Sequence, residues 1–419
     1  MTNPLTERTA ALRRRHAAEA RFKYSGLLAI MIAVGFLIVM VGSIAWIGAG
    51  AFKQTQVQLS VYLDPAEIDA NALEQANYGK LIKSALRSRF ADVKKRKHKK
   101  KLYNLVSYDA DYALKRKVSE NPGLIGQSVT MWFVASDDLD MLIKGNLGAP
   151  GSATQQRFDA MQLGWVKALQ QDGAIRTVFN RSFFTSGDSR EPELAGILGA
   201  LTGTALTLLV CFVLSFPIGI LAAIYLEEFA KNNRWNDLIE VNINNLAAVP
   251  SIVFGLLGLA VFLNVFDMPR SSPLVGGLVL ALMTLPTMII AARAALRAVP
   301  PSIREAALGI GATRIQMVFH HVAPLALPGM LTGAIVGMAR ALGETAPLLM
   351  IGMVAFIVDI PNSVLKPATV LPVQIFLWAD SPERAFLEKT SAAIIVLITF
   401  LIVMNLAAIL LRNKYSQRF

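Results

Sequence analysis

Six long apolar segments constrain the fold of this 419-residue chain more than any other feature. A helix that spans a membrane needs about 20 consecutive apolar residues. Segments of that length lie at 25–50, 194–226, 246–266, 273–292, 327–356 and 392–411. Only 17% of the residues are charged, whereas soluble domains usually carry about 25%. The sequence therefore predicts an all-α polytopic membrane protein with six transmembrane helices. The first segment exceeds the apolar core of a signal peptide, so we expect a retained anchor.

The distribution of basic residues predicts the orientation of these spans. Six Lys and Arg residues precede the first segment, and Arg412, Lys414 and Arg418 follow the sixth. Basic residues near span ends favour the cytoplasm, and six spans put both termini on the same side. We therefore place both termini in the cytoplasm of a cell with an inner (cytoplasmic) membrane. The connection from Arg293 to Arg314 then also lies inside.

The positions of the six spans and this orientation divide the chain into four parts. Residues 1–24 form a basic cytoplasmic arm, residues 25–51 the first span and residues 191–415 the remaining five spans. Residues 52–190 fall outside the membrane, and they are too long and polar for a simple loop. Alternating residues at 55–63 predict a strand, while 65–90 and 158–171 have helical patterns. We expect a small extracytoplasmic α+β domain of unknown role between spans one and two.

A basic run at 94–101 stands out in that domain. We interpret it as a solvated helix end or loop, with an electrostatic patch for an anionic ligand, lipid or partner as the alternative. Its position outside the membrane and its lack of interleaved aromatic residues argue against nucleic acid. The expected contacts of the chain thus include membrane lipid but no nucleic acid.

Several chemistries find no support in the residues. Cys211 is the single cysteine, and it lies in an apolar run, which excludes an internal disulfide framework or a cysteine metal cluster. The four histidines lack a second ligand at a convincing spacing, and no G-x-x-x-x-G-K-[ST] phosphate loop occurs. We find no nucleophile–base pair either. The chain is therefore not expected to be an enzyme, and no catalytic residue, metal or cofactor is predicted.

The connection at 300–324 has a specific local pattern. Pro300 and Pro301 end the preceding helix, and Ser302 with Glu305 three residues later predicts a capping box. Ala306, Ala307 and Ile310 give this short helix a small apolar face, and Gly311 is placed to stop it. Thr313 is expected to cap a second helix over 314–322, which Pro324 ends. The pattern predicts a helix-turn-helix whose small-residue face suits a groove on another protein.

The motif Glu305-Ala306-Ala307, followed by Gly311 and Pro324, resembles the EAA coupling motif of ABC importer permeases. In that family the loop docks on the ATP-hydrolysing ABC subunit and passes its motion to the spans. The resemblance therefore implies that Glu305, Ala306, Ala307 and Gly311 couple this chain to such an ATPase.

Further stretches resemble signatures of the phosphate-specific permeases, PstA type. They are 248–256, 283–287 and 340–347, and the last contains the run Gly-Glu-Thr-Ala-Pro. The match covers roughly residues 190–415, while 52–190 resembles an uncharacterised domain found at the front of some of these permeases. The resemblance implies a permease subunit of an ATP-driven importer of inorganic phosphate. Its implied partners are the ATP-hydrolysing subunit, a second permease subunit in a heterodimer, and an extracytoplasmic phosphate-binding protein.

The fifth segment carries two charges, Arg340 and Glu344, roughly in its middle. A charge facing lipid there costs a few kcal/mol, and a spacing of four residues allows the two to pair. Glycines at 329, 333 and 337 form successive G-x-x-x-G steps, a pattern of close helix packing. The two charges are thus expected to face protein, where spans meet around a path.

We interpret Arg340 as a contact for an oxyanion in transit, because its planar guanidinium matches tetrahedral oxyanions. Glu344 would orient it, and Thr345 could add a hydroxyl. A structural ion pair or a gating role are the alternatives. Arg293, at the cytoplasmic end of the fourth span, is a further candidate for the exit path, although arginines there ordinarily snorkel to the surface.

Other functions remain open from the residues alone. An importer of another oxyanion, such as sulfate, molybdate or phosphonate, fits the same spacing. A membrane sensor with 52–190 as its ligand module is a different class, but the short termini offer little room for an output module.

Overall fold

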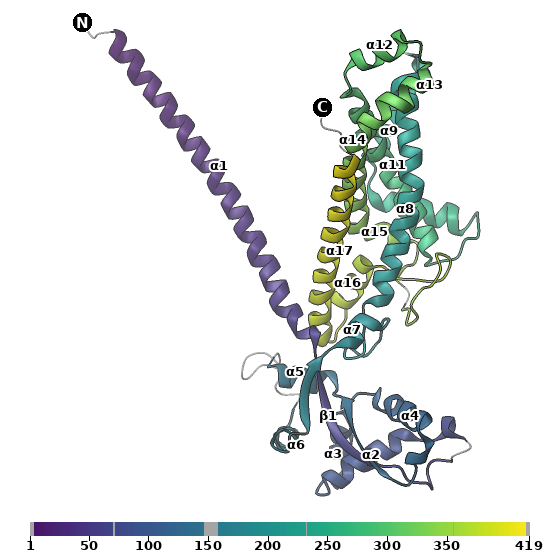
Figure 1. Cartoon of the computed structure of the whole chain (residues 1–419). Helices are drawn as coiled ribbons and strands as arrows, with labels where there is room; N and C mark the ends of the chain where they lie inside the picture. Colours follow the sequence, from purple (N-terminus) through teal and green to yellow (C-terminus); the bar gives the residue numbers. More distant parts are fainter. Residues whose placement is uncertain (1–3, 70–71, 146–157, 232, 355, 416–419) are drawn as a thin grey trace.

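The computed structural model describes residues 4–69, 72–145, 158–231, 233–354 and 356–415. Figure 1 shows an upright bundle of long helices with a small domain of strands and short helices at one end, and a first helix that diverges from the bundle. Arg418 lies outside the described residues, as do the side chains of Arg8, Arg13 and Arg14, on which the predicted orientation partly depends.

Among the described residues, five helices are long and apolar enough to cross a membrane, judged by length and composition. They are α1 (Pro4–Gly48), α8 (Leu198–Ile224), α11 (Pro273–Arg297), α14 (Ala323–Gly343) and α17 (Ala385–Tyr415). A bent helix pair supplies a sixth span if the pair counts as one. The prediction of a mostly helical, multi-span chain is confirmed, because the described residues contain five candidate spans, or six if the bent pair counts as one. The α8 helix passes Pro217 without interruption.

The predicted third span, 246–266, is wrong as one continuous helix. The chain instead forms α9 (Arg234–Ala247) and then α10 (Ser251–Leu257), which the π-helical η6 (Gly258–Leu263) continues. The two parts meet at an angle of 103°. Pro250 explains the break, because it has no N–H and forces its neighbour Val249 away from helical geometry.

The predicted fifth span, 327–356, is also too long. The α14 helix ends at Gly343, and Glu344 has an extended backbone with φ −79° and ψ 124°. A separate short helix, α15 (Ala346–Met350), follows. Pro347 accounts for the end of α14, since its ring would clash with the carbonyl of Gly343 four residues earlier. Another short helix, α16 (Leu371–Ala379), precedes α17.

The centre of the bundle is α11, which packs against α8 and α14. The predicted close packing of the α14 glycines is confirmed. A Cβ atom on Gly333 would lie 2.3 Å from Cβ of Ala291, and one on Gly329 would lie 2.7 Å from Cβ of Ala295. Glycine at these positions therefore lets the two helices approach closely.

We expect Gly333→Ala to destabilise the bundle although alanine favours helices. The added methyl group overpacks the α11–α14 contact, which typically costs about 1–3 kcal/mol. Gly343→Ala in the same helix is the matched control, because its Cβ would meet nothing within 4 Å. Thermal unfolding of the detergent-purified chain measures both, and equal melting temperatures for the two variants would contradict the close packing.

The N-terminal domain, defined as residues 53–179, is built on a three-stranded antiparallel sheet. Its strands are β1 (Lys53–Tyr62), β2 (Ser128–Val134) and β3 (Ile175–Phe179), in the order β2-β1-β3. In the central strand, Val57 pairs with Phe133 on one side and Ile175 on the other. The strand predicted at 55–63 is thus confirmed almost to the residue.

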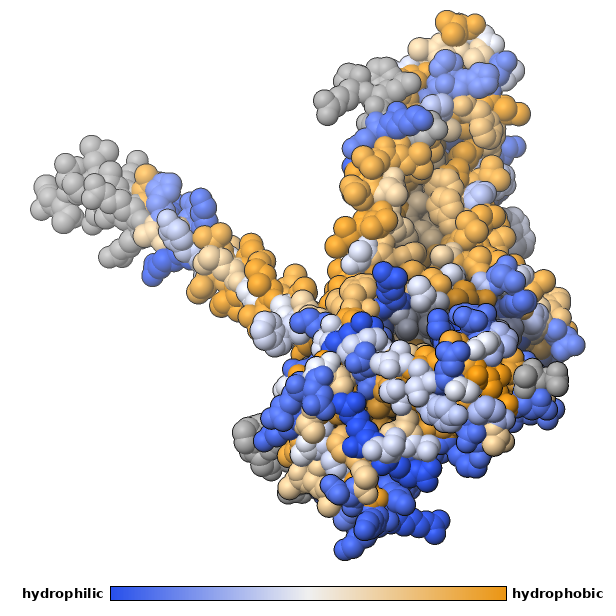
Figure 2. All heavy atoms as spheres, turned by 60° about the horizontal axis from the view of Figure 1, so that its bottom comes forward, coloured by the Kyte–Doolittle hydropathy of each residue, from blue (hydrophilic) through white to orange (hydrophobic). Residues whose placement is uncertain are grey.

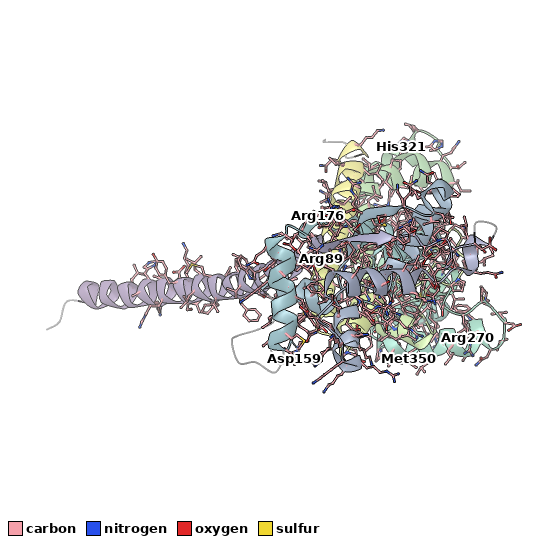
Figure 3. All side chains as sticks on the ribbon, turned by 90° about the horizontal axis from the view of Figure 1, so that it is seen from below. Arg89, Asp159, Arg176, Arg270, His321 and Met350 are labelled. Atoms are coloured by element: carbon pink, nitrogen blue, oxygen red, sulfur yellow. The ribbon has the colours of Figure 1, made fainter. Side chains whose placement is uncertain are left out.

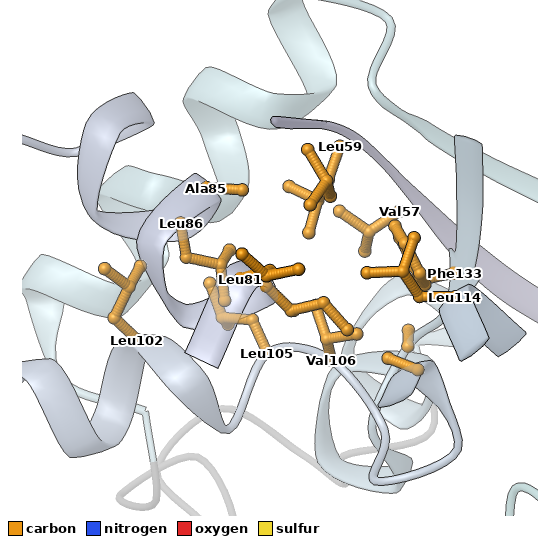
Figure 4. Packing of buried hydrophobic residues seen from close by; sticks show 14 of the residues in the cluster. Val57, Leu59, Leu81, Ala85, Leu86, Leu102, Leu105, Val106, Leu114 and Phe133 are labelled. Carbon is orange, nitrogen blue, oxygen red and sulfur yellow. The ribbon is translucent and has the colours of Figure 1, made fainter. Parts of the chain in front are cut away.

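Among its described residues, five α-helices complete this domain, together with single turns at η2 (Leu73–Gln75) and η3 (Pro122–Leu124). They are α2 (Tyr78–Arg89), α3 (Arg96–Tyr103), α4 (Ala110–Glu120), α5 (Asp137–Lys144) and α6 (Ala160–Gln171). Buried Leu59, Leu81, Leu114 and Phe133 join the sheet to the helices in one apolar core (Figure 4). The domain has the predicted α+β composition.

Two expectations for the domain need adjustment. The helix predicted over 65–90 starts only at Tyr78, where the side chain of Asn77 accepts the Lys80 N–H and caps it. The basic run at 94–101 forms most of α3 and is largely exposed. Its Lys101 pairs with Asp159, and this hydrogen bond and charge lower the pKa of the Asp159 carboxyl. Figure 3 labels Asp159.

Buried charges fix the N-terminal domain to the last helix of the bundle. Lys144, at the end of α5, lies 3.3 Å from the carboxylate of Glu388 in the first turn of α17 and also pairs with Asp140. The neighbouring Lys389 donates to the carbonyl of Ala195 at 3.1 Å. Around this joint lie η1 (Ala49–Phe52) and α7 (Arg181–Thr185).

The N-terminal domain and the helix bundle differ in the hydropathy of their surfaces. Figure 2 shows a mostly hydrophilic surface over the N-terminal domain and a mostly hydrophobic one along the sides of the helix bundle. Exposed large apolar side chains are frequent along the part of α1 whose side chains are described, among them Ile32, Phe36 and Val39. Apolar surface on this scale suits contact with lipid or with other membrane helices.

Candidate functional site

The connection after α11 forms a protruding tip at the end of the bundle opposite the N-terminal domain (Figure 1). Its first helix is α12 (Pro301–Gly309), whose N-cap is Pro300. The predicted Ser302–Glu305 capping box is wrong. Because Pro301 takes the first helical position, which suits its fixed φ and missing N–H, Ser302 lies inside the helix and cannot cap it.

Gly311 and Thr313 have the predicted local roles. Gly311 has φ +90°, a left-handed conformation that stops α12 and that side chains other than glycine adopt at a cost. Thr313 caps α13 (Arg314–Gln316) by a reciprocal capping box with Gln316.

The second helix of the tip does not end at Pro324, contrary to the prediction. It continues through the π-helical turn η7 (Met317–Val322) directly into α14, so that residues 314–343 form one helix. The wider π-helical turn ends at Val322, two residues before Pro324, as often happens where a regular hydrogen bond is lost. The tip is therefore a short helix joined by a turn to the start of a long span.

The two faces of α12 differ in exposure. Glu305 and Ala306 are exposed, as are the apolar side chains of Leu308 and Ile310, the latter 82% exposed. Ala307 is buried against the bundle instead. Of the four coupling candidates, the structure therefore presents Glu305, Ala306 and Gly311 outward and turns Ala307 inward. Sequence reasoning missed Leu308 and, on α13, the exposed Ile315.

A network of ion pairs lies beneath the tip. The π-helical turn η5 (Tyr225–Phe229) that ends α8 carries Glu227 and Glu228. Arg293 binds Glu227 at 3.3 Å and Glu240 of α9 at 2.9 Å, and Arg297 binds Glu227 at 2.8 Å. The structure thus surrounds Arg293 with carboxylates. Sequence reasoning missed these partners, because they are distant along the chain; Glu227, for example, lies 66 positions before Arg293.

Arg340 and Glu344 lie at the end of α14, which corrects their predicted position in the middle of a straight span. The guanidinium Nε of Arg340 is 3.7 Å from the Glu344 carboxylate, and the side chains are 48% and 21% exposed. Arg340 occupies the last turn of the helix, where a cation also favours the helix dipole. Thr345 starts α15 by accepting the Leu348 and Leu349 N–H groups through its carbonyl. The three candidates are therefore close together in a break between two helices.

The break at Arg340–Thr345 lies beside the broken third span. A Cβ atom on Gly255 in α10 would come within 2.7 Å of Cα of Pro347 in α15, so the two short helices touch. Interrupted helices at membrane depth are a recurrent setting for substrate sites in transporters. Among the described residues, no group of three or more His, Cys, Asp or Glu side chains is arranged to hold a metal ion.

Comparisons with known proteins match both parts of the chain. A family model described as a binding-protein-dependent transport system inner membrane component matches residues 215–419. A model described as a domain of unknown function (DUF3333) matches residues 9–150. The first range includes the tip and the Arg340–Thr345 break.

Individual relatives are named as permeases. The chain is 32% identical over 228 residues to phosphate transport system permease protein PstA 1 of Mycobacterium tuberculosis (strain ATCC 25618 / H37Rv), covering 54% of this chain and 73% of that protein. It is 32% identical to phosphate transport system permease protein PstA of Yersinia pestis, covering 51% and 71%. It is 30% identical to the probable ABC transporter permease protein YqgI of Bacillus subtilis (strain 168), covering 54% and 81%.

Among solved structures, an inward-facing form of the MetNI methionine ABC transporter aligns with 52% of this chain and 95% of that chain, at 17% identity and a TM-score of 0.42. A score at that level supports no conclusion about this chain. The sequence relatives are sufficient by themselves, because identities of 30% and 32% extend over 71%, 73% and 81% of those three proteins. The chain belongs to the family of binding-protein-dependent transport system inner membrane components, among the phosphate transport system permeases of the PstA type.

Proposed function

We propose that this chain is one permease half of an ATP-driven importer that moves inorganic phosphate across the cytoplasmic membrane. The observation that carries the proposal is the identity to relatives named phosphate transport system permeases, over 71% and 73% of their length. The geometry supports it at two places, the tip and the break in α14. In this proposal, ATP hydrolysis belongs to a separate partner subunit.

The outward face of the tip is the proposed contact with the ATP-hydrolysing subunit. Glu305 and Ala306 are exposed there beside Leu308 and Ile310, a small charged and apolar surface at the extreme end of the bundle. A contact of this kind needs a rigid base, and the buried Ala307 together with the left-handed turn at Gly311 provides one.

The break at Arg340, Glu344 and Thr345 is the proposed substrate path. Half of the Arg340 side chain is exposed in this chain alone, so it faces space that another subunit would complete. Arginine recognises tetrahedral oxyanions by paired hydrogen bonds and stays charged. A second permease subunit would enclose the path, and an extracytoplasmic phosphate-binding protein would deliver the anion. Arg293 remains a candidate for the exit, although two carboxylates already contact it.

The proposed orientation places the tip and both termini in the cytoplasm, and residues 52–190 outside. The N-terminal domain and the tip lie at opposite ends of the bundle, which supports this assignment (Figure 1).

A cysteine placed at exposed Lys97 in α3 is expected to react with a membrane-impermeant thiol reagent on intact spheroplasts. Lys414→Cys, at the end of α17, is the matched control and should react only after lysis. The native Cys211 is buried and should stay silent in both. Labelling of the Lys97 variant only after lysis would place the N-terminal domain on the cytoplasmic side and contradict the proposed orientation.

The rate of ATP hydrolysis by the purified assembly tests which anion the importer transports. We expect inorganic phosphate, presented with the phosphate-binding protein, to stimulate hydrolysis severalfold. Sulfate, molybdate and a phosphonate are the comparison anions. Stimulation by one of these instead of phosphate would favour an importer of another oxyanion, and no response to any of them would contradict an importer altogether.

A further inference from the structure

Arg304 connects three parts of the molecule that are distant in sequence. It precedes Glu305 in α12, but its side chain points back toward the bundle and is only 21% exposed. Its guanidinium binds the carboxylate of Glu228 at 2.6 Å, and the Glu228 side chain is almost completely buried. The same guanidinium donates to the carbonyl oxygens of Val299 at 2.6 Å and Leu296 at 2.9 Å.

These contacts give the buried Glu228 carboxylate a charged partner and add a donor to two carbonyl groups near the end of α11, of which the Leu296 carbonyl also accepts the Val299 N–H at 3.2 Å. The last carbonyl groups of a helix have no partner within it, and Leu296 lies at the end of α11. Glu228 lies at the end of α8, where a negative charge opposes the helix dipole. One arginine therefore binds the end of α11, neutralises the charge at the end of α8 and fixes α12 to both.

The neighbouring ion pairs of Arg293 and Arg297 connect the spans to one another but not to α12. Arg293 and Arg297 join η5 to α11 and α9 through Glu227 and Glu240, and neither forms an ion pair with a described residue of α12. Among the described ion pairs of this region, the Arg304–Glu228 pair is the one that includes the coupling helix. Ala307 also packs into the same core, but apolar contacts are not directional and so do not fix the orientation of α12 on the spans.

We propose that Arg304 is a positioning residue that transmits force from the coupling helix to the spans. It does so by locking α12 to the ends of α8 and α11 through Glu228 and the two carbonyl groups. The proposal rests on the proposed importer function. Glu305 faces the ATPase and Arg304, one residue earlier, faces the bundle, so a push on the outer face of α12 reaches the spans through Arg304.

The test measures the phosphate transported per ATP hydrolysed by the whole assembly in proteoliposomes. Two variants are informative. Arg304→Lys keeps the positive charge but loses the planar fork that holds Glu228 and the carbonyl groups together. The double variant Arg304→Gln/Glu228→Gln leaves no lone buried charge, which protects folding. Arg297→Gln is the matched control, since it removes an arginine from the same network without touching α12.

We expect both informative variants to bind the ATP-hydrolysing subunit normally and to hydrolyse ATP, while transport per ATP falls at least tenfold. The Arg297 variant should keep the wild-type ratio. A wild-type ratio in either informative variant would overturn the proposal. So would a loss of ATPase binding in both, because the docking residues Glu305 and Ala306 are unchanged. If the unmodified assembly moves no phosphate, the importer function itself fails, which is a separate outcome.

Discussion

Replacing Glu305 by alanine is expected to abolish ATP-driven phosphate uptake while the chain still inserts and folds. The carboxylate is exposed at the tip, and loss of an exposed side chain usually costs little stability. Its role is expected to lie in the contact with the ATPase, where removal of a charged anchor typically costs about 2 kcal/mol or more of binding. Uptake and co-purification of the ATPase are the two measurements.

A matched control is Glu19→Ala, which removes an exposed carboxylate near the N-terminus, far along the chain from the tip. It should transport at the wild-type rate. Gly311→Pro should behave like Glu305→Ala, because the left-handed turn with φ +90° is closed to proline. Full uptake with unchanged ATPase recovery in the Glu305 variant would remove the tip from the coupling mechanism.

Replacing Arg340 by glutamine is expected to lower phosphate uptake about 10- to 100-fold with normal expression. A hydrogen bond to a charged group is worth about 1.5–3 kcal/mol, which corresponds to that range. The Arg340–Glu344 pair is only partly buried in this chain, and such exposed pairs contribute about 1 kcal/mol or less to stability. Expression and transport therefore separate cleanly at this site.

The double variant Arg340→Gln/Glu344→Gln distinguishes an anion contact from a structural pair. A structural pair needs both charges or neither, so the neutral double variant would regain transport. If Arg340 binds the anion, the double variant stays impaired, and Arg340→Lys is also impaired because lysine lacks the fork. Wild-type uptake by the double variant would leave Arg340 as a helix-end contact without a part in transport.

The spans illustrate what hydropathy predicts and what it misses. Apolar length located α8, α11 and α17, because lipid requires an uninterrupted apolar helix. The same criterion ran the third span across Pro250 from the end of α9 and joined α14 to α15 across Pro347, where these prolines interrupt the helix. Each proline removes one backbone N–H and so interrupts the helix, but it barely changes the average hydropathy of a whole span. Hydropathy therefore misses both breaks, although both prolines are visible in the sequence.

The candidate site shows a similar division. The glycine spacing in α14 predicted close packing correctly, since one helix face has a fixed period. Arg304 counted only as a basic residue of a cytoplasmic connection, and its contacts were not predicted, because Glu228 and the end of α11 meet it only after the chain has folded. The motif predicts an outward Ala307, yet the orientation of α12 on the bundle turns it inward. Long-range placement depends on how helices pack, which local periodicity does not specify.

The most direct test of the account is phosphate accumulation in proteoliposomes that contain this chain with its ATP-hydrolysing and second permease subunits. Radiolabelled phosphate is supplied outside with the binding protein, and ATP is enclosed inside or left out. The account predicts accumulation against the gradient only with ATP, and none when the assembly carries Glu305→Ala. Equal phosphate entry with and without ATP, or no entry in either case, would contradict it.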